Sequence, residues 1–110
     1  MTKRYILTPQ ADSDLEEIFL YTIKKWGMSQ AEKYLLELDE AMIKLAEGEV
    51  SGKNCEMLLP EKGKGLQYYH VNKHYVIYRN YHDGIEVITL YHDRMDLPYH
   101  LERLAEASDS

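Results

Sequence analysis

The densest group of chemically reactive side chains lies in residues 90–101, which read LYHDRMDLPYHL. Two histidines, two aspartates and an arginine within twelve positions can hold a metal ion or transfer protons. Asp96 and His100 stand four residues apart, a spacing that places two ligands on one face of a helix. Asp96 ahead of Leu97-Pro98 is also typical of a helix start, with an N-cap and a proline in the first turn. We favour the helix start and expect no metal site.

This interpretation leaves residues 92–95 as an exposed turn between a last strand and a short terminal helix. The apolar stripe of that helix would be Leu97, Leu101 and Leu104. We therefore predict that the turn is a contact surface. Catalytic use of His92 and Arg94 is the weaker alternative.

The composition describes a single folded domain over residues 1–110, with 45% hydrophobic and 29% charged residues. The one cysteine, Cys55, excludes an internal disulfide and a cysteine-rich zinc site, and we expect no cofactor. No apolar run approaches the roughly 20 residues that span a bilayer. The N-terminus turns acidic too early for a signal peptide, so we expect a cytoplasmic protein without membrane contact.

The net charge of −6 weighs against nucleic acid as the main partner, because phosphate binding depends on lysine and arginine. We expect no direct sequence-specific binding to nucleic acid and favour a protein partner. The ten tyrosines support this, since tyrosine combines apolar area with a polar tip.

The N-terminal half predicts a strand over residues 4–8 followed by two helices. Thr8 and Pro9 suit the N-cap and first position of a helix that ends at Gly27. Ser29–Glu32 has the pattern of a capping box, which opens a second helix that ends near Gly48. A link of about two residues makes the pair an antiparallel αα-hairpin. We interpret Trp26 as a packing residue that closes this hairpin.

The C-terminal half predicts an antiparallel meander of strands over residues 66–71, 74–81 and 85–92, with turns at 72–73 and 82–84. Residues 48–65 are irregular; the stretch CEMLL within them is either a turn or a short strand, and Cys55 there could be exposed. Strand alternation places Ile85, Val87, Thr89 and Tyr91 on one face. One face of the sheet should cover the hairpin, and the other, carrying tyrosines, is a candidate binding surface.

The order β-α-α-β-β-β predicts an α+β fold in which an αα-hairpin packs on a small antiparallel sheet. The N-terminal strand joins this sheet most simply at an edge. Several residues in this order also match a known pattern. They are Leu7, Ala11, Asp14, Leu15, Ile18, Tyr21, Trp26, Gly27, Ala31, Tyr34, Leu38, Leu45 and Gly52, then the strand YVIYR, then Leu90, His92, Met95 and Asp96. Over residues of about 4–97 the chain resembles a ParE-type toxin of the RelE/ParE superfamily, from bacterial type II toxin–antitoxin systems.

The resemblance implies a non-enzymatic toxin that inhibits DNA gyrase and is neutralised by a ParD-like antitoxin. The antitoxin's tail would fold over the toxin, partly as a helix along the hairpin and partly as an extended segment near the sheet. The residues expected to bind target or partner are Tyr69, Arg79, His92, Arg94, Met95 and Asp96. One departure concerns Gln67, which follows Gly65-Leu66 where many relatives carry arginine.

Two alternatives remain open. A ribosome-dependent mRNA endonuclease of the RelE type could use Arg79, His92, Arg94 and Tyr99. The acidic composition disfavours it, since such an enzyme is expected to hold RNA on a basic surface. The second alternative is an inactive remnant that only binds antitoxin. The presence of Gln67 where many relatives carry arginine keeps this alternative open.

Overall fold

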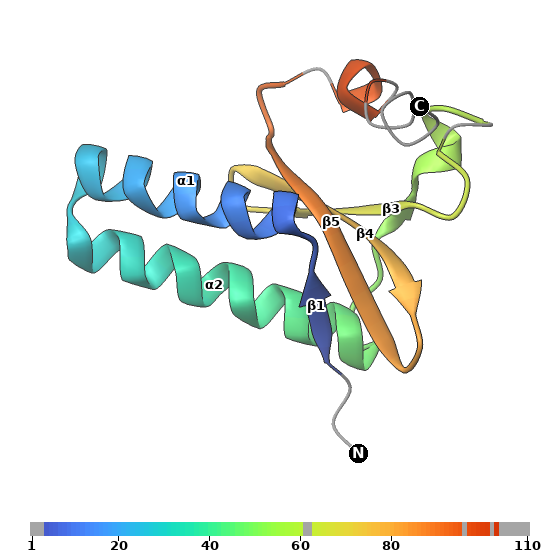
Figure 1. The fold of residues 1–110 in the computed structure, drawn as a ribbon, viewed down its shortest axis with the longest axis horizontal. Coiled ribbons are helices and arrows are strands. Elements are labelled where there is room, and N and C mark those ends of the chain that lie inside the picture. The colour runs from blue at the N-terminus through green and yellow to red at the C-terminus, as the bar shows by residue number, and fades with distance from the viewer. Residues whose placement is uncertain (1–3, 61–62, 96, 102, 104–110) are drawn as a thin grey trace.

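The computed structural model describes residues 4–60, 63–95, 97–101 and 103, and two helices cover one face of its five-stranded sheet (Figure 1). The elements are β1 (Tyr5–Leu7), α1 (Pro9–Trp26), α2 (Met28–Glu47), β2 (Lys53–Asn54), a 3-10 turn (Cys55–Met57), β3 (Gln67–Val71), β4 (His74–Tyr81) and β5 (Gly84–His92). Residues 97–101 are helical. The predicted α+β fold is confirmed. No helix in the described part of the chain is long and apolar enough to cross a membrane.

The strands lie in the order β1-β5-β4-β3-β2. The pairs β3–β4 and β4–β5 are antiparallel, as predicted, and β2 adds an antiparallel pair with β3 that was not predicted. β1 joins the opposite edge of the sheet, parallel to β5. β1 pairs only with residues 85–87 of β5, because the chain then turns into α1. The outer edge of β5 beyond that point therefore faces a helix.

The predicted start of α1 is confirmed, because the Thr8 hydroxyl accepts from the backbone N–H of Ala11 at 3.1 Å and Pro9 follows. The predicted capping box at Ser29 is wrong. Gly27, with φ of 94°, ends α1 and directly precedes α2, so the link is one residue and Ser29 already lies inside the helix. α2 ends at Gly48 in the left-handed conformation, as expected.

The main core lies between the hairpin and the sheet. Its buried residues are Ala11, Leu38, Met42, Leu45 and Ala46 from the helices, and Val71, Val76, Tyr78, Ile85, Val87 and Leu90 from the strands. At 25 cal/mol per Å² of buried apolar surface, such side chains contribute about 1.5–3 kcal/mol each. Trp26 is not among them. Its side chain is 60% exposed, so the prediction that it closes the hairpin by packing is wrong.

A bulge in β5 changes which side chains face the helices. Ile77 of β4 pairs with Thr89, whereas its neighbour Tyr78 pairs with Val87, which leaves Ile88 as an extra residue. The alternation shifts at this point, and Leu90 joins Ile85 and Val87 in the main core. The predicted shared face of Ile85, Val87, Thr89 and Tyr91 is therefore wrong beyond Val87, where Tyr91 packs on the opposite side.

The opposite face of the sheet carries a second core. Cys55, Ile77, Leu97 and Leu101 are buried there, with Tyr68, Tyr75 and Tyr91 packed against them. The segment after β2 and the helical turn 97–101 thus cover the face that we expected to be open (Figure 1). CEMLL forms a 3-10 turn at its start, and burial raises the pKa of the Cys55 thiol to about 11. Cys55 is thus a core residue, contrary to its expected exposure.

Gly84 permits the close approach of β1 to β5. A Cβ atom at this position would lie 1.8 Å from the backbone oxygen of Arg4. We predict that Gly84→Ala lowers the free energy of unfolding by about 1–3 kcal/mol, because the strands must separate to admit the methyl group. Denaturant unfolding measures the change, with Asp83→Ala in the same turn as the control. Equal stability of the two variants would contradict the close packing of this edge.

Candidate interaction site

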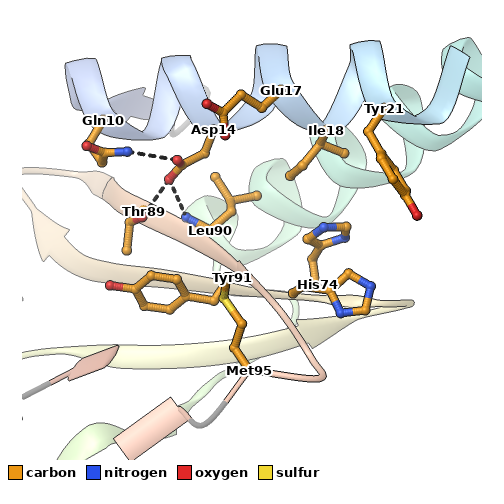
Figure 2. Close-up of a pocket in the computed structure, with 11 residues that line it drawn as sticks. Gln10, Asp14, Glu17, Ile18, Tyr21, His74, Thr89, Leu90, Tyr91 and Met95 are labelled. Carbon is orange, nitrogen blue, oxygen red and sulfur yellow. Dashed lines mark hydrogen bonds between the residues drawn. The ribbon is translucent and has the colours of Figure 1, made fainter. Parts of the chain in front are cut away.

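A cleft of about 450 Å³ lies between α1 and the part of β5 that β1 leaves uncovered. Its lining residues are Gln10, Asp14, Glu17, Ile18 and Tyr21 from α1, and His74, Thr89, Leu90, Tyr91, His92 and Met95 from the sheet and the turn after it (Figure 2). Ile18 and Leu90 give the cleft an apolar centre, and Glu17 places a carboxylate on the helix side. His74 stands at one end, with the His92 ring 5.1 Å from it between centroids.

Asp14 holds α1 onto the edge of β5. Its Oδ2 accepts from the backbone N–H of Leu90 at 3.1 Å and from the hydroxyl of Thr89 at 2.5 Å (Figure 2). The Thr8 hydroxyl donates to the carbonyl of Ile88 at 2.6 Å. These side chains supply the hydrogen bonds that a longer β1 would have made. The bulge at Ile88 contributes, because it brings both the Thr89 hydroxyl and the Leu90 N–H to one carboxylate.

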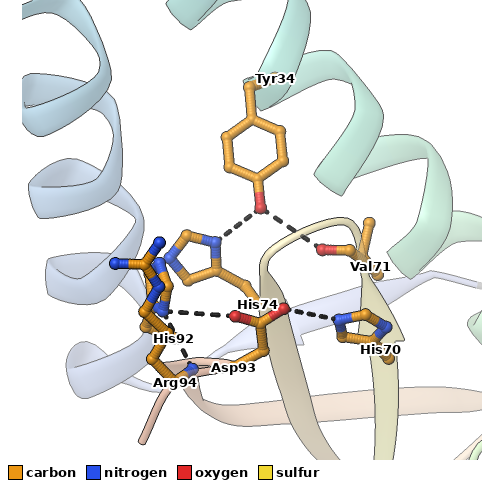
Figure 3. A network of polar contacts seen from close by, with 7 residues as sticks. All are labelled: Tyr34, His70, Val71, His74, His92, Asp93 and Arg94. Atoms are coloured by element: carbon orange, nitrogen blue, oxygen red, sulfur yellow. Dashed lines mark hydrogen bonds and ion pairs between the residues drawn. The ribbon is translucent and has the colours of Figure 1, made fainter. Parts of the chain in front are cut away.

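A polar cluster continues from the cleft across the ends of β3, β4 and β5. Asp93 Oδ2 lies 3.1 Å from Nε2 of His70, and Oδ1 lies 3.4 Å from Nδ1 of His92 (Figure 3). The hydrogen bond from His70 is the main cause that holds the pKa of Asp93 below its usual value. The Asp93 N–H donates to the carbonyl of Lys73 at 2.8 Å, and the Arg94 N–H donates to Nδ1 of His92 at 3.1 Å. These contacts with β3, with the β3–β4 turn and with His92 fix the conformation of the turn.

His74 and Tyr34 form the half-buried part of this cluster. Nδ1 of His74 lies 2.6 Å from the Tyr34 hydroxyl, and its ring stands edge-on to His92 with centroids 5.1 Å apart (Figure 3). Burial, with a smaller contribution from His92, lowers the pKa of His74 to about 4. Burial also raises the pKa of Tyr34 to about 12. Both groups are therefore neutral at pH 7 and link α2 to the sheet without a buried charge.

The structure brings together three of the residues that the sequence singled out. His92 and Met95 line the cleft, and Arg94 lies exposed between them in the chain. Tyr69 instead packs against the main core beneath the hairpin. Arg79 lies toward the other end of β4, where its Nε is 2.6 Å from Glu86. Asp96 lies outside the described residues.

The sequence analysis missed His70 and His74, and it gave Asp14 no structural role beyond its match to the family pattern. Asp14 stands three residues after Ala11 and four before Ile18, inside the apolar stripe. A charged residue in a buried stripe is the signal that could have identified it. His70 and His74 reach the cluster only because of how the strands pair, and the sequence offered no signal for that pairing. Among the described residues, no three His, Cys, Asp or Glu side chains are placed to hold a metal ion.

Comparisons with known proteins find matches along most of the chain. Residues 5–97 match the family described as the ParE toxin of type II toxin-antitoxin system, parDE. Toxin ParE1 of Mycobacterium tuberculosis H37Rv is 36% identical over 102 residues, which cover 92% of this chain and 100% of that protein. Toxin ParE of Escherichia coli is 34% identical over 103 residues, with 93% of each covered.

A solved structure, titled Chromosomal ParDE TA system from P. aeruginosa, shares the fold. It superposes with a TM-score of 0.65 at 16% sequence identity, covering 83% of this chain and 96% of the other.

We predict that Asp14→Ala lowers the free energy of unfolding by about 1–3 kcal/mol, because the Leu90 N–H loses its acceptor where α1 restricts access of water. Asp12→Ala, an exposed aspartate of the same helix, is the matched control and should cost at most about 0.5 kcal/mol. Chemical denaturation measures both, and Asp14→Asn, which keeps one amide oxygen, should recover part of the loss. An Asp14→Ala variant as stable as Asp12→Ala would refute the role of this carboxylate.

We also predict that stability falls as the pH drops from 6.5 to about 4. In this window the unfolded chain protonates His74, whose ordinary pKa is 6.5, whereas the folded chain does not until about pH 4. Because solvent screens part of the effect at this half-buried ring, the expected loss is about 2 kcal/mol.

Unfolding midpoints across this pH range measure the loss. His74→Gln should flatten the pH dependence, whereas His82→Asn in the exposed β4–β5 turn should leave it unchanged. The assignment to His74 fails if the two variants show the same slope.

Proposed function

Because the chain belongs to the ParE toxin family of type II toxin–antitoxin systems, we propose that it inhibits DNA gyrase in the cytoplasm and is neutralised by a ParD-like antitoxin. The family match over residues 5–97 carries this proposal. The cleft beside α1 and the turn after β5 supply surfaces for the two partners.

The cleft suits an extended segment of the antitoxin. In an antiparallel strand the N–H and C=O of one residue point to the same edge. Since the Leu90 N–H points at Asp14, the Leu90 carbonyl and the His92 N–H lie on that outer edge as well. A peptide strand can pair with such groups and place a side chain over the apolar centre of the cleft.

The outer surface of the hairpin suits a helical segment of the same partner. Leu20 and Leu36 are 56% and 67% exposed, and Met28 at the hairpin tip is 52% exposed. Large apolar side chains left open on neighbouring helices mark a surface that a partner covers. An amphipathic helix laid along the hairpin would remove them from water.

The turn of residues 92–95 is the proposed contact with gyrase. Arg94 is exposed and Met95 is 45% exposed, and both residue types are enriched at protein interfaces. The backbone hydrogen bonds of Asp93 and Arg94 hold the turn before any partner arrives. A preformed surface loses less conformational entropy on binding.

The arrangement supports inhibition of a protein target over RNA cleavage. Cleavage needs a proton donor, a base and a phosphate-binding cation that can all reach one phosphodiester of the RNA. Arg79 is engaged with Glu86 and lies far along β4 from His92. Tyr99 stands on the terminal helical turn, where it accepts a hydrogen bond from Arg103.

The purified protein should block gyrase supercoiling of relaxed plasmid or accumulate cleaved DNA. Translating ribosomes supplied with the same protein should yield intact mRNA. Truncated mRNA would instead support the endonuclease. Failure of both assays with tight antitoxin binding retained would support the inactive remnant.

We predict that Arg94→Ala weakens gyrase inhibition roughly tenfold without changing the thermal midpoint, because an exposed interface arginine adds binding energy and little stability. Lys53→Ala is the control, since it removes an exposed cation from β2 at the far edge of the sheet, and it should retain inhibition. Dose–response curves in the supercoiling assay measure both variants. If the loss of inhibition follows the loss of stability, the turn is a structural element and the contact assignment fails.

A further inference from the structure

The tip of the hairpin presents an exposed indole with two ammonium groups close to its ring. The Trp26 side chain is 60% exposed. Lys25 Nζ lies 5.6 Å from the ring centroid and Lys73 Nζ lies 5.9 Å from it. Lys25 belongs to α1 and Lys73 to the β3–β4 turn, so the fold brings the two cations to one ring. Each gains from the π-face, but they repel each other, and an anion placed between them would relieve that repulsion.

The turn that adjoins Lys73 carries a third cation, Arg94. The Asp93 N–H donates to the Lys73 carbonyl, which sets the turn after β5 against the β3–β4 turn. Arg94 is exposed and follows His92 and Asp93 in this turn (Figure 3). Among the described residues, no carboxylate forms an ion pair with Lys25, Lys73 or Arg94. Two nearby carboxylates are engaged elsewhere, Asp93 with His70 and Glu37 with Asn72 at 3.5 Å.

We propose that this basic–aromatic patch, formed by Lys25, Trp26, Lys73 and Arg94, binds a short segment of single-stranded DNA. The three cations contact consecutive phosphates, and the indole stacks on an unpaired base. A duplex keeps its base faces stacked inside, so only a single strand offers one to Trp26. The choice of DNA over RNA rests on the proposed function, because gyrase opens and cleaves DNA where the toxin would sit.

The net charge of −6 sets the character of this binding. Repulsion from the rest of the acidic surface lowers the affinity, and the small number of phosphate contacts makes it fall further as salt competes for the phosphates, so binding is tightest at low ionic strength. Phosphate contacts and stacking tolerate every base, so the patch carries no sequence preference. The patch therefore agrees with the expectation that the protein does not read nucleic acid sequence.

The single tryptophan of the chain is a direct reporter of the patch. Titration of the purified full chain with a dT12 oligonucleotide at low salt should quench Trp26 fluorescence. A plot of log affinity against log salt concentration should have a slope of about −2, as expected for three phosphates on a single strand. Lys25→Ala with Lys73→Ala should weaken binding roughly tenfold and make the slope shallower by about 1.4. Lys44→Ala, at the opposite end of α2, should change neither.

Trp26→Phe, followed by anisotropy of a labelled dT12, keeps an aromatic ring and should bind more tightly than Trp26→Ala. Several results would overturn the proposal: no quenching by dT12, equal weakening by Lys44→Ala, tighter binding of U12 than dT12, or equal affinity for a polyglutamate peptide of matched charge. The gyrase supercoiling assay is run in parallel. Gyrase inhibition without binding of dT12 refutes the patch and leaves the toxin function standing, whereas binding without inhibition refutes the function alone.

Discussion

The hydrogen bonds that Asp14 accepts at the edge of β5 are the constraint on which the other features of the site depend. β1 is only three residues long and leaves β5 without a neighbouring strand beyond Val87. A carboxylate on α1 takes the place of that strand and fixes the helix beside the open edge. A cleft remains between this helix and the open edge of β5. The same fixed position carries the hairpin tip to the β3–β4 turn, where Trp26 meets Lys73.

Local signals predicted most of the fold. Thr8, Pro9, Gly27 and Gly48 mark helix ends because caps and positive φ depend on the residue itself. The strands followed from alternation and from turns such as Asn72-Lys73. Local signals could not predict which residues face one another across neighbouring strands. The bulge at Ile88 leaves no compositional trace, and the meeting of His70, His74 and His92 depends on register. Cys55 and Trp26 were misjudged for the same reason, since burial depends on what later segments cover.

The cleft and the basic–aromatic patch share the cluster around His92. Asp93 ties the turn to β3 through His70 and to the β3–β4 turn through Lys73, while Tyr34 and His74 tie that end of the sheet to α2. An antitoxin segment lying along β5 would end at this turn. It would therefore reach the residues proposed to touch gyrase and DNA, which offers a physical reason why one partner can exclude the other.

Residue-resolved amide hydrogen exchange, with and without the ParD-like antitoxin, tests most directly whether the open edge of β5 is the contact surface. In the free protein, the Leu90 amide should exchange slowly because Asp14 holds it, and the His92 amide should exchange quickly because it points outward. Binding should protect the His92 amide. The Tyr91 amide, which points toward β4, should change little. An unchanged His92 amide in a saturated complex would contradict the assignment of this edge.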